Sequence, residues 1–373
     1  MNRKIIFALL IVLNSNSLFA LPLFSLRSGA SCQSCHINPT GKGMRNSFGV
    51  SFSQDELPLQ MFRAETEFEE FTPKLNDFFT IGFDARTLFY QNSENKKSQF
   101  FQMQGDLYFD LKINKVVRLY FDKGLRDGFE LFALAKNLPA KGFLKVGQFT
   151  PSFGIKTDDH NTWTRSEIGF GERSEDAGLE IGFAPDDFLI TAGIFNGNPG
   201  GLGFPPKKSK AVILRTEYQN SFSFLNFMLG GSYYLMPEFA NKRIVKNYFG
   251  GFTIDKNFTL MYEFVNLKTN LGFFDDFKDI NNLSMHYQVT TGFDLRYSFE
   301  TKTMEDHISS EIQLSPSNIL HGGAKEIKYT RHSIGFSVYP VSGVEILNLY
   351  RINLEPTTQI ENNEYQLVFH FFI

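Results

Sequence analysis

The stretch Phe101–Ile113 (FQMQGDLYFDLKI) decides the fold class of this 373-residue chain. Its odd-numbered positions hold apolar residues or glycine, and its even-numbered positions hold Gln, Asp, Tyr or Lys. A period of two sustained over the whole stretch predicts an extended strand with one apolar and one polar face. Soluble β-sandwiches and membrane barrels both contain such strands, so the period alone leaves both classes open.

The same pattern recurs from about Thr66 to the last residue. The predicted strands lie near residues 77–90, 99–113, 116–125, 128–135, 141–149, 176–183, 188–195, 209–219, 222–235, 246–254, 258–268, 284–299, 306–314, 326–339, 343–354 and 363–373. Connections after even-numbered strands are short, and those after odd-numbered strands are mostly long. An even strand number with this asymmetry is typical of a bacterial outer-membrane barrel. The alternation from Tyr365 to Ile373 also resembles the terminal strand of such barrels.

We therefore predict an all-β fold, an antiparallel outer-membrane barrel of about sixteen strands over residues 66–373, in contact with membrane lipid. A periplasmic β-sandwich is the alternative. Composition agrees with the barrel, because 43 Phe and 14 Tyr would populate a lipid-facing band and its aromatic girdles. The formal net charge of −3 argues against a nucleic-acid partner, which needs a basic footprint. Two cysteines are too few for a disulfide scaffold.

Residues 1–20 have the form of a cleaved secretory signal peptide. Arg3 and Lys4 precede the apolar run Ile5–Leu13, and the segment ends at Ala20. This apolar core is too short to span a membrane. The mature protein is therefore expected to be exported, so that its cysteines meet an oxidising compartment.

Both cysteines fall in the segment Cys32-Gln33-Ser34-Cys35-His36, shortly after the leader. C-x-x-C-H is the attachment signature of a c-type haem. Two thiols at this spacing can form thioethers to the vinyl groups, and the next residue, His36, can reach the iron as proximal ligand. A Cys32–Cys35 disulfide would leave His36 without a role, and a zinc site would lack ligands. We expect one haem c in residues 21–65, with Met44 as a candidate distal ligand.

Other candidate sites rest on less specific patterns. Long connections carry carboxylates and imidazole that could contact an external cation, against the alternative of a solvated acidic rim. These residues are Asp158, Asp159, His160, Asp275, Asp276 and Asp279. Polar strand residues would line the lumen of a transport channel. These residues are Gln102, Asp106, Lys112, Asp294 and Arg296. No Ser/His/Asp set stands out, so no catalytic residue is predicted.

Two resemblances follow from these residues. The segments Gly142–Gly154 (GFLKVGQFTPSFG), Asp176–Gly182 (DAGLEIG) and Ala192–Gly197 (AGIFNG) resemble the phosphate-selective porin family, which implies a sixteen-stranded barrel. The order of leader, single C-x-x-C-H and barrel resembles the fused monohaem cytochrome-porins of the outer membrane. Only Cys32, Cys35 and His36 carry over from that family.

The second resemblance implies electron transfer between an extracellular donor or acceptor, Fe(II) among them, and a periplasmic redox protein. Some members of that family are iron oxidases, so an extracellular metal oxidoreductase is one implied activity. The alternative is a solute-diffusing porin whose N-terminal segment carries a haem or a disulfide with a role outside transport. The sequence carries no sign of a subunit interface, so it predicts no oligomeric state.

Overall fold

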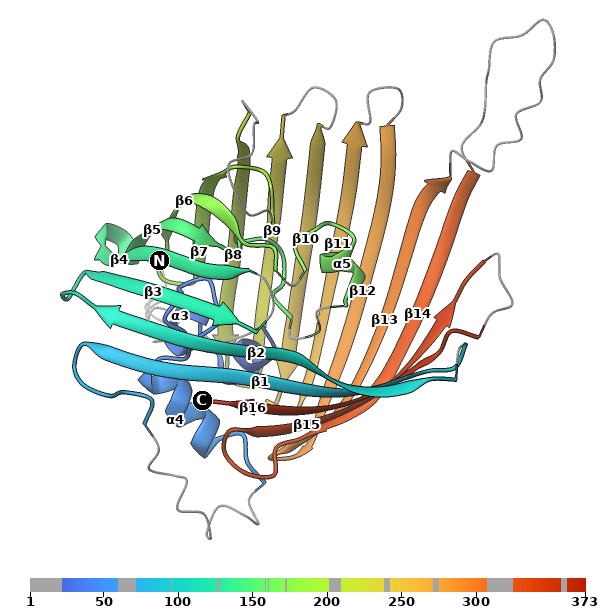
Figure 1. The fold of residues 1–373 in the computed structure, drawn as a ribbon, viewed down its shortest axis with the longest axis horizontal. Coiled ribbons are helices and arrows are strands. Elements are labelled where there is room, and N and C mark those ends of the chain that lie inside the picture. The colour runs from blue at the N-terminus through green and yellow to red at the C-terminus, as the bar shows by residue number, and fades with distance from the viewer. Residues whose placement is uncertain are drawn as a thin grey trace, which may run out of the picture.

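The computed structural model describes residues 22–59, 72–94, 96–125, 128–157, 159, 161–171, 173–200, 209–237, 242–270, 275–306, 325–356 and 361–373. The sixteen strands within these ranges form one closed barrel (Figure 1). Each strand pairs antiparallel with its neighbours in sequence, and β1 closes the ring against β16. The predicted all-β barrel of about sixteen strands is confirmed.

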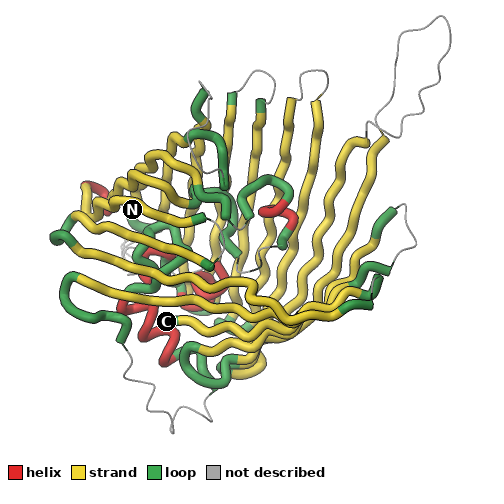
Figure 2. The backbone as a smooth tube through the Cα atoms, in the orientation of Figure 1, coloured by secondary structure: helices red, strands yellow, loops and turns green. Residues whose placement is uncertain are grey.

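The wall consists of β1 (Phe79–Asn92), β2 (Ser98–Lys112), β3 (Val117–Gly124), β4 (Phe129–Leu138), β5 (Gly142–Phe149), β6 (Asp176–Phe183), β7 (Phe188–Phe195), β8 (Ala211–Phe222), β9 (Leu225–Met236), β10 (Arg243–Ile254), β11 (Phe258–Asn270), β12 (Asp275–Thr290), β13 (Phe293–Asp306), β14 (Lys325–Val338), β15 (Val344–Leu354) and β16 (Glu364–Phe372). The helices are α2 (Pro22–Ser28), α3 (Cys32–Cys35), α4 (Ser47–Asp55), η4 (Pro139–Lys141) and α5 (Trp163–Ser166). Figure 2 shows the strands in yellow and the helices in red. Among the described helices, none is both long and apolar enough to cross a membrane.

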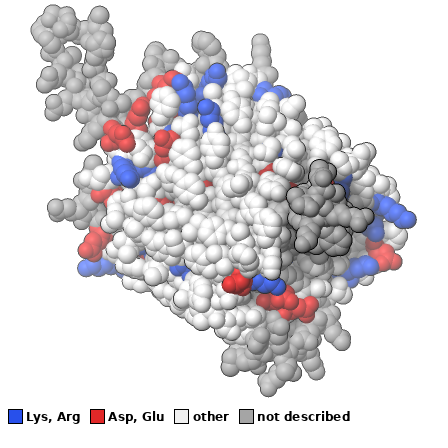
Figure 3. Space-filling view, turned by 180° about the vertical axis from the view of Figure 1, so that it is seen from behind, with Lys and Arg blue, Asp and Glu red and all other residues white. Residues whose placement is uncertain are grey.

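The barrel wall has its apolar face outside and its polar face inside. On β2, Leu107 and Leu111 are 52% and 42% exposed. The residues that directly precede them, Asp106 and Asp110, are buried. Figure 3 shows a broad area of the outer wall without charged side chains, which gather toward its margins. A soluble sandwich would bury its apolar face and expose its polar one. The inverted arrangement is that of a barrel whose solvent is lipid, which decides between the two classes left open by the sequence.

The alternation of Phe101–Ile113 is interrupted by a bulge. Thr87 pairs with Gln102 and Arg86 pairs with Gln104, which leaves Met103 unpaired on β2. An extra residue exchanges the faces on either side of it. Gln102 therefore lies with Thr87 on the outer face, where the two side chains are hydrogen-bonded at 2.9 Å, and only Gln104 faces inward. The expectation that Gln102 lines the lumen is wrong for this reason.

Three predicted boundaries differ from the structure between residues 269 and 314. The predicted strand 284–299 is the hairpin of β12 and β13, which reverses at Gly292 with φ +83°. Residues 275–283, expected in a loop, are the first part of β12. Polar and apolar residues alternate on both sides of this two-residue turn. Gly292 is therefore the one residue in the sequence that indicates a turn there. Residues 307–314, predicted as part of a strand, lie outside the described residues.

The two ends of the barrel differ in their connections. Short turns join the even-numbered strands to the next, as at Asn114, whose side-chain oxygen accepts from the amides of Val116 and Val117 at 2.8 Å each. At the other end, the long connection 150–175 folds inward, and its helix α5 packs against β11 and β12. The chain enters β1 and leaves β16 at the end with the short turns (Figure 1).

Candidate functional site: a cysteine and histidine plug inside the barrel

Residues 22–59 lie inside the barrel near the end that carries the C-terminus, and we call them the plug (Figure 1). Its first helix, α2, packs on β9, β10 and β11. Arg27 of α2 forms a buried ion pair with Asp294 at 2.8 Å. Ser25 donates to the side-chain oxygen of Gln219 at 2.9 Å. The plug is thus joined to the lumen wall by buried polar contacts as well as by apolar packing.

The C-x-x-C segment forms one helical turn, α3, and its two cysteines are free thiols. Burial raises the pKa of Cys32 to about 12 and that of Cys35 to about 11. Redox-active dithiols instead have a lowered pKa, since their chemistry needs a thiolate. Neither thiol has the lowered pKa of a redox-active dithiol. Two thiols at i and i+3 on one turn have the spacing that thioether attachment requires.

His36 directly follows α3 and has one ring nitrogen engaged by the plug backbone. Its Nδ1 lies 3.2 Å from the carbonyl oxygen of Gly43. Burial, and next the charge of Arg45, lower the pKa of His36 to about 3, so the imidazole is neutral at physiological pH. Histidines that bind a metal usually donate the other ring N–H to such a carbonyl, which leaves Nε2 as the ligating atom. The donor set of Cys32, Cys35 and His36 therefore fits a c-type haem.

Met44 lies on the other side of the short hairpin that contains His36. His36 and Arg45 form an antiparallel bridge, so their side chains share one face. Ile37 and Met44 share the opposite face, where both are buried in the wall cluster that includes Tyr120. This placement favours a packing role for Met44, because it lies in the apolar cluster with Ile37 and Tyr120.

Asn46 organises the plug, although the sequence analysis did not single it out. Its side-chain amide donates to the carbonyl of Ser34 at 2.8 Å, near the end of α3, and its side-chain oxygen accepts from the amide of Gly49 as the N-cap of α4. Gly49 itself cannot carry a side chain, since a Cβ there would lie 2.2 Å from the carbonyl oxygen of Cys35. The signal that identifies Asn46 is local, an Asn just before a helical segment.

Lysines of the wall and of loop 150–175 hold the loop between His36 and Met44. Lys145 of β5 is completely buried, and it donates to Asn38 at 3.2 Å and to Thr40 at 3.1 Å. Lys156 donates to Thr40 and to the carbonyl of Gly41, both at 3.3 Å. Burial, and next the charge of Lys145, lower the pKa of Lys156 to about 7. Sequence spacing gave no sign of these contacts, because they join residues about a hundred positions apart.

Four of the six residues expected to contact an external cation lie in the described part of the chain, on loop 150–175 and on β12. Asp158 and His160 lie outside the described residues, and Asp159 is paired with Arg351. The other three lie on the wall strand β12, although a loop was expected: Asp275 pairs with Lys268 at 2.6 Å, Asp279 accepts from Asn266 at 2.7 Å, and Asp276 lies opposite Thr269. Within the described ranges, no group of three or more His, Cys, Asp or Glu residues is arranged to hold a metal ion.

The described residues of loop 150–175 also contact the wall, through α5 on β11 and β12. Trp163 of α5 lies between two cations, with Lys302 5.1 Å and Arg331 4.6 Å from its ring. Glu167 accepts from Lys278 at 3.0 Å and from Lys302 at 2.6 Å. Burial raises the pKa of Glu167, but hydrogen bonds from the side chains of these two lysines lower it by more. The pKa of Glu167 is therefore below its usual value. The wall of the lumen is thus linked to this loop by half-buried ion pairs.

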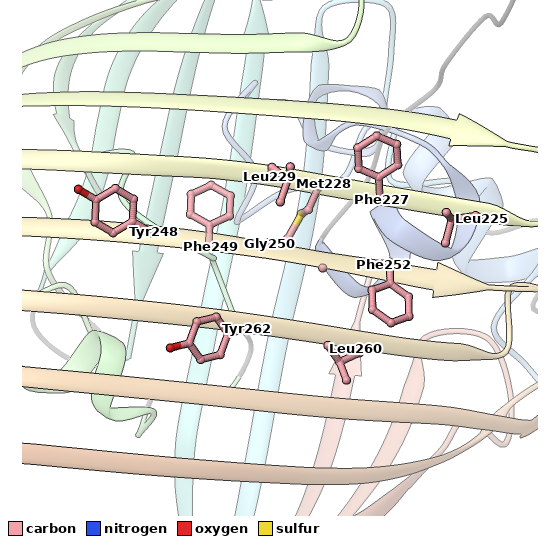
Figure 4. Close-up of a pocket in the computed structure, with 11 residues that line it drawn as sticks. Leu225, Phe227, Met228, Leu229, Tyr248, Phe249, Gly250, Phe252, Leu260 and Tyr262 are labelled. Atoms are coloured by element: carbon pink, nitrogen blue, oxygen red, sulfur yellow. The ribbon is translucent and has the colours of Figure 1, made fainter.

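An apolar pocket of 670 Å³ lies across β9, β10 and β11 (Figure 4). Gly250 leaves a gap there in the row of outward side chains, and the exposed residues Leu229, Tyr248 and Tyr262 border it. These side chains belong to the lipid-facing surface of the wall. The pocket therefore does not belong to the cysteine and histidine site, which lies inside the barrel.

No protein-family model matches the sequence, and the comparison with curated proteins found no match. Solved structures resemble the fold. High-pH OprB of Pseudomonas putida has a TM-score of 0.61 at 11% identity, over 86% of this chain and 100% of that one. In-vitro folded OmpT of Vibrio cholerae has a TM-score of 0.57 at 12% identity, over 80% and 98%. An anion-selective porin from Comamonas acidovorans has a TM-score of 0.52 at 9% identity, over 79% and 99%. The chain thus has a porin-like barrel of the outer-membrane type.

Proposed function

We propose that this chain is an outer-membrane electron carrier, in which one c-type haem is attached to Cys32 and Cys35 inside the barrel and held by His36. The observation that carries the proposal is the 3.2 Å contact between His36 Nδ1 and the Gly43 carbonyl, beside two free thiols at the attachment spacing. That contact is the outer-shell arrangement of a metal-binding histidine. The apolar outer wall supports a location in the outer membrane.

Each residue of the site has a separable task. Cys32 and Cys35 would fix the group to the plug, and neutral His36 would supply the proximal nitrogen. When bound, the haem supplies a one-electron Fe(III)/Fe(II) couple. Lys145 and Lys156 hold the loop that follows His36 through their hydrogen bonds to Asn38, Thr40 and the Gly41 carbonyl. The wall separates the site from lipid, so that electrons would pass between a periplasmic redox protein and a donor or acceptor outside, such as a metal ion. Residues 1–20 would be removed on export, which predicts Leu21 as the mature N-terminus.

The test is the absorption spectrum of the purified protein, oxidised and then reduced with dithionite, together with a haem stain of the denatured band. We expect sharp reduced c-type bands and a stain that survives denaturation. The matched variant Cys32→Ser/Cys35→Ser should keep the folded barrel and lose the stain. A colourless wild-type protein from a host with working c-haem maturation would refute the electron-carrier proposal.

A second candidate is a diffusion channel, which is favoured by the fold shared with porins of known structure. In this case solute would pass the plug, and the charged lumen residues would set selectivity. Conductance in planar bilayers separates the two candidates. A large, steady single-channel conductance supports the channel, whereas a closed barrel with rapidly reducible haem supports the carrier.

A further inference from the structure

One peptide group joins the proximal histidine to the barrel wall. The carbonyl of the Gly43–Met44 peptide lies 3.2 Å from His36 Nδ1. The N–H of the same peptide donates to the hydroxyl of Tyr120 on β3 at 3.1 Å. Tyr120, the peptide and His36 thus form a continuous hydrogen-bonded chain from the wall to the site.

We propose that Tyr120 is a positioning residue of the haem site, which sets the redox potential of the haem through the Gly43–Met44 peptide. The inference rests on the proposed function, because it assumes a haem on His36. It goes beyond that function in assigning a role to a residue of the barrel, which contacts neither the histidine nor the cysteines through a hydrogen bond.

The direction of the effect follows from the polarity of the peptide. A peptide whose N–H donates to an acceptor has a more negative carbonyl oxygen, since hydrogen bonds in a chain polarise one another. The Gly43 carbonyl then accepts more strongly from His36 and raises the basicity of the ligating nitrogen. A more basic ligand stabilises the ferric state. Tyr120 is therefore expected to hold the potential low.

The surroundings keep the peptide in this orientation. Tyr120 is 1% exposed and stacked on Phe132, with the ring centroids 4.8 Å apart. Gly43 has φ +69°, and a Cβ there would lie 2.2 Å from the Tyr120 hydroxyl. The amide of Ile37 donates to the Met44 carbonyl at 3.0 Å, which fixes the next peptide. The tyrosine ring is packed firmly in place. Only glycine at position 43 allows the loop to approach the Tyr120 hydroxyl this closely.

Tyr120→Phe tests the proposal, because it removes the acceptor and keeps the stacked ring. Tyr108→Phe is the matched control: Tyr108 is buried on β2 in the same cluster, and within the described residues its hydroxyl has no hydrogen bond to the plug. Haem content is measured first by stain and absorption. The midpoint potential follows by spectroelectrochemical titration, and the iron–histidine stretch of the reduced protein by resonance Raman spectroscopy.

In Tyr120→Phe we expect full haem content, a lower iron–histidine stretching frequency and a raised potential. The one-electron equilibrium should move roughly three- to tenfold toward the ferrous state, and tenfold corresponds to about 59 mV. Tyr108→Phe should match the wild type. Full haem content with an unchanged potential and stretch in Tyr120→Phe overturns the role of Tyr120 alone. A wild-type protein without haem overturns both this role and the proposed function.

A second substitution covers the case in which Tyr120→Phe fails to fold. Difluorotyrosine at position 120 keeps the ring and the hydroxyl, and it makes the oxygen a weaker acceptor. A smaller rise of the potential in the same direction supports the chain of hydrogen bonds. An unchanged potential in this folded protein overturns it.

Discussion

The contact of Lys145 with the plug gives the sharpest test of how the plug is held. The Lys145 Nζ lies 2.6 Å from a carboxylate oxygen of Glu180, and both side chains are essentially unexposed. The same ammonium group donates to Asn38 and Thr40 of the plug and lies 4.4 Å from the ring centroid of Phe149. Lys145→Met keeps most of the apolar stem and removes the charge that all these groups share.

The expected cost is large because the partners of Lys145 stay buried. Removing one member of a buried ion pair costs about 3–5 kcal/mol, since the other charge remains without compensation. Two plug hydrogen bonds of about 1 kcal/mol each are also lost. We expect the free energy of unfolding to fall by about 5–7 kcal/mol. In Lys145→Met/Glu180→Gln, about 2 kcal/mol should return, because the uncompensated carboxylate is gone.

Lys141 provides a matched control. Its ammonium lies 3.8 Å from Asp186 in an exposed pair, and such pairs contribute about 0–1 kcal/mol. Unfolding in guanidinium is followed in detergent for both lysine-to-methionine variants, and limited proteolysis reports release of the plug. Equal stability losses in Lys145→Met and Lys141→Met, with a protected plug in both, would show that the buried contacts do not hold the plug.

Three further predictions follow from the plug and loop 150–175. Gly43→Ala should cost roughly 1–3 kcal/mol from the left-handed backbone alone and lower haem yield in a stained gel, whereas Ser28→Ala should not. The pKa of Lys156 is about 7 in the folded chain against an ordinary 10.5, so the unfolded state binds more protons between these values. Stability measured by guanidinium unfolding should therefore rise from pH 7 to pH 10.5, and Lys156→Met should flatten the rise. Trp163, the single tryptophan, should have a shorter fluorescence lifetime in wild type than in Cys32→Ser/Cys35→Ser, because a haem in the lumen would quench it. Equal lifetimes would contradict a haem near α5.

Most of the barrel could be predicted from the sequence because strands have a short period. Alternation identifies a strand wherever one face differs from the other, and it did so from β1 to β11. It failed at Met103 and at Gly292, where one unpaired residue or a two-residue turn leaves the composition unchanged. The period alone also could not say which face is outside. Burial of Asp106 beside exposed Leu107 settles that question only in the structure.

The sequence suggests the candidate site only through residues that are adjacent in the chain. Cys32, Cys35 and His36 form one contiguous motif, whose spacing carries its chemistry. Tyr120 and Lys145 reach the same loop from strands far along the chain, and no local pattern marks either of them. Contacts between a loop and a wall depend on strand register. Register emerges only when the whole barrel closes.

The closed ladder between β1 and β16 bears on the order of biogenesis. Under the proposed function, haem would have to reach Cys32 and Cys35, which lie in the plug inside a wall that is closed between β1 and β16. If a haem is attached, attachment would therefore precede closure of the barrel, and the strands would assemble around the bound cofactor. Secretion, attachment and closure of the barrel would then have to follow in that order, and a barrel closed without haem would have no route to acquire it.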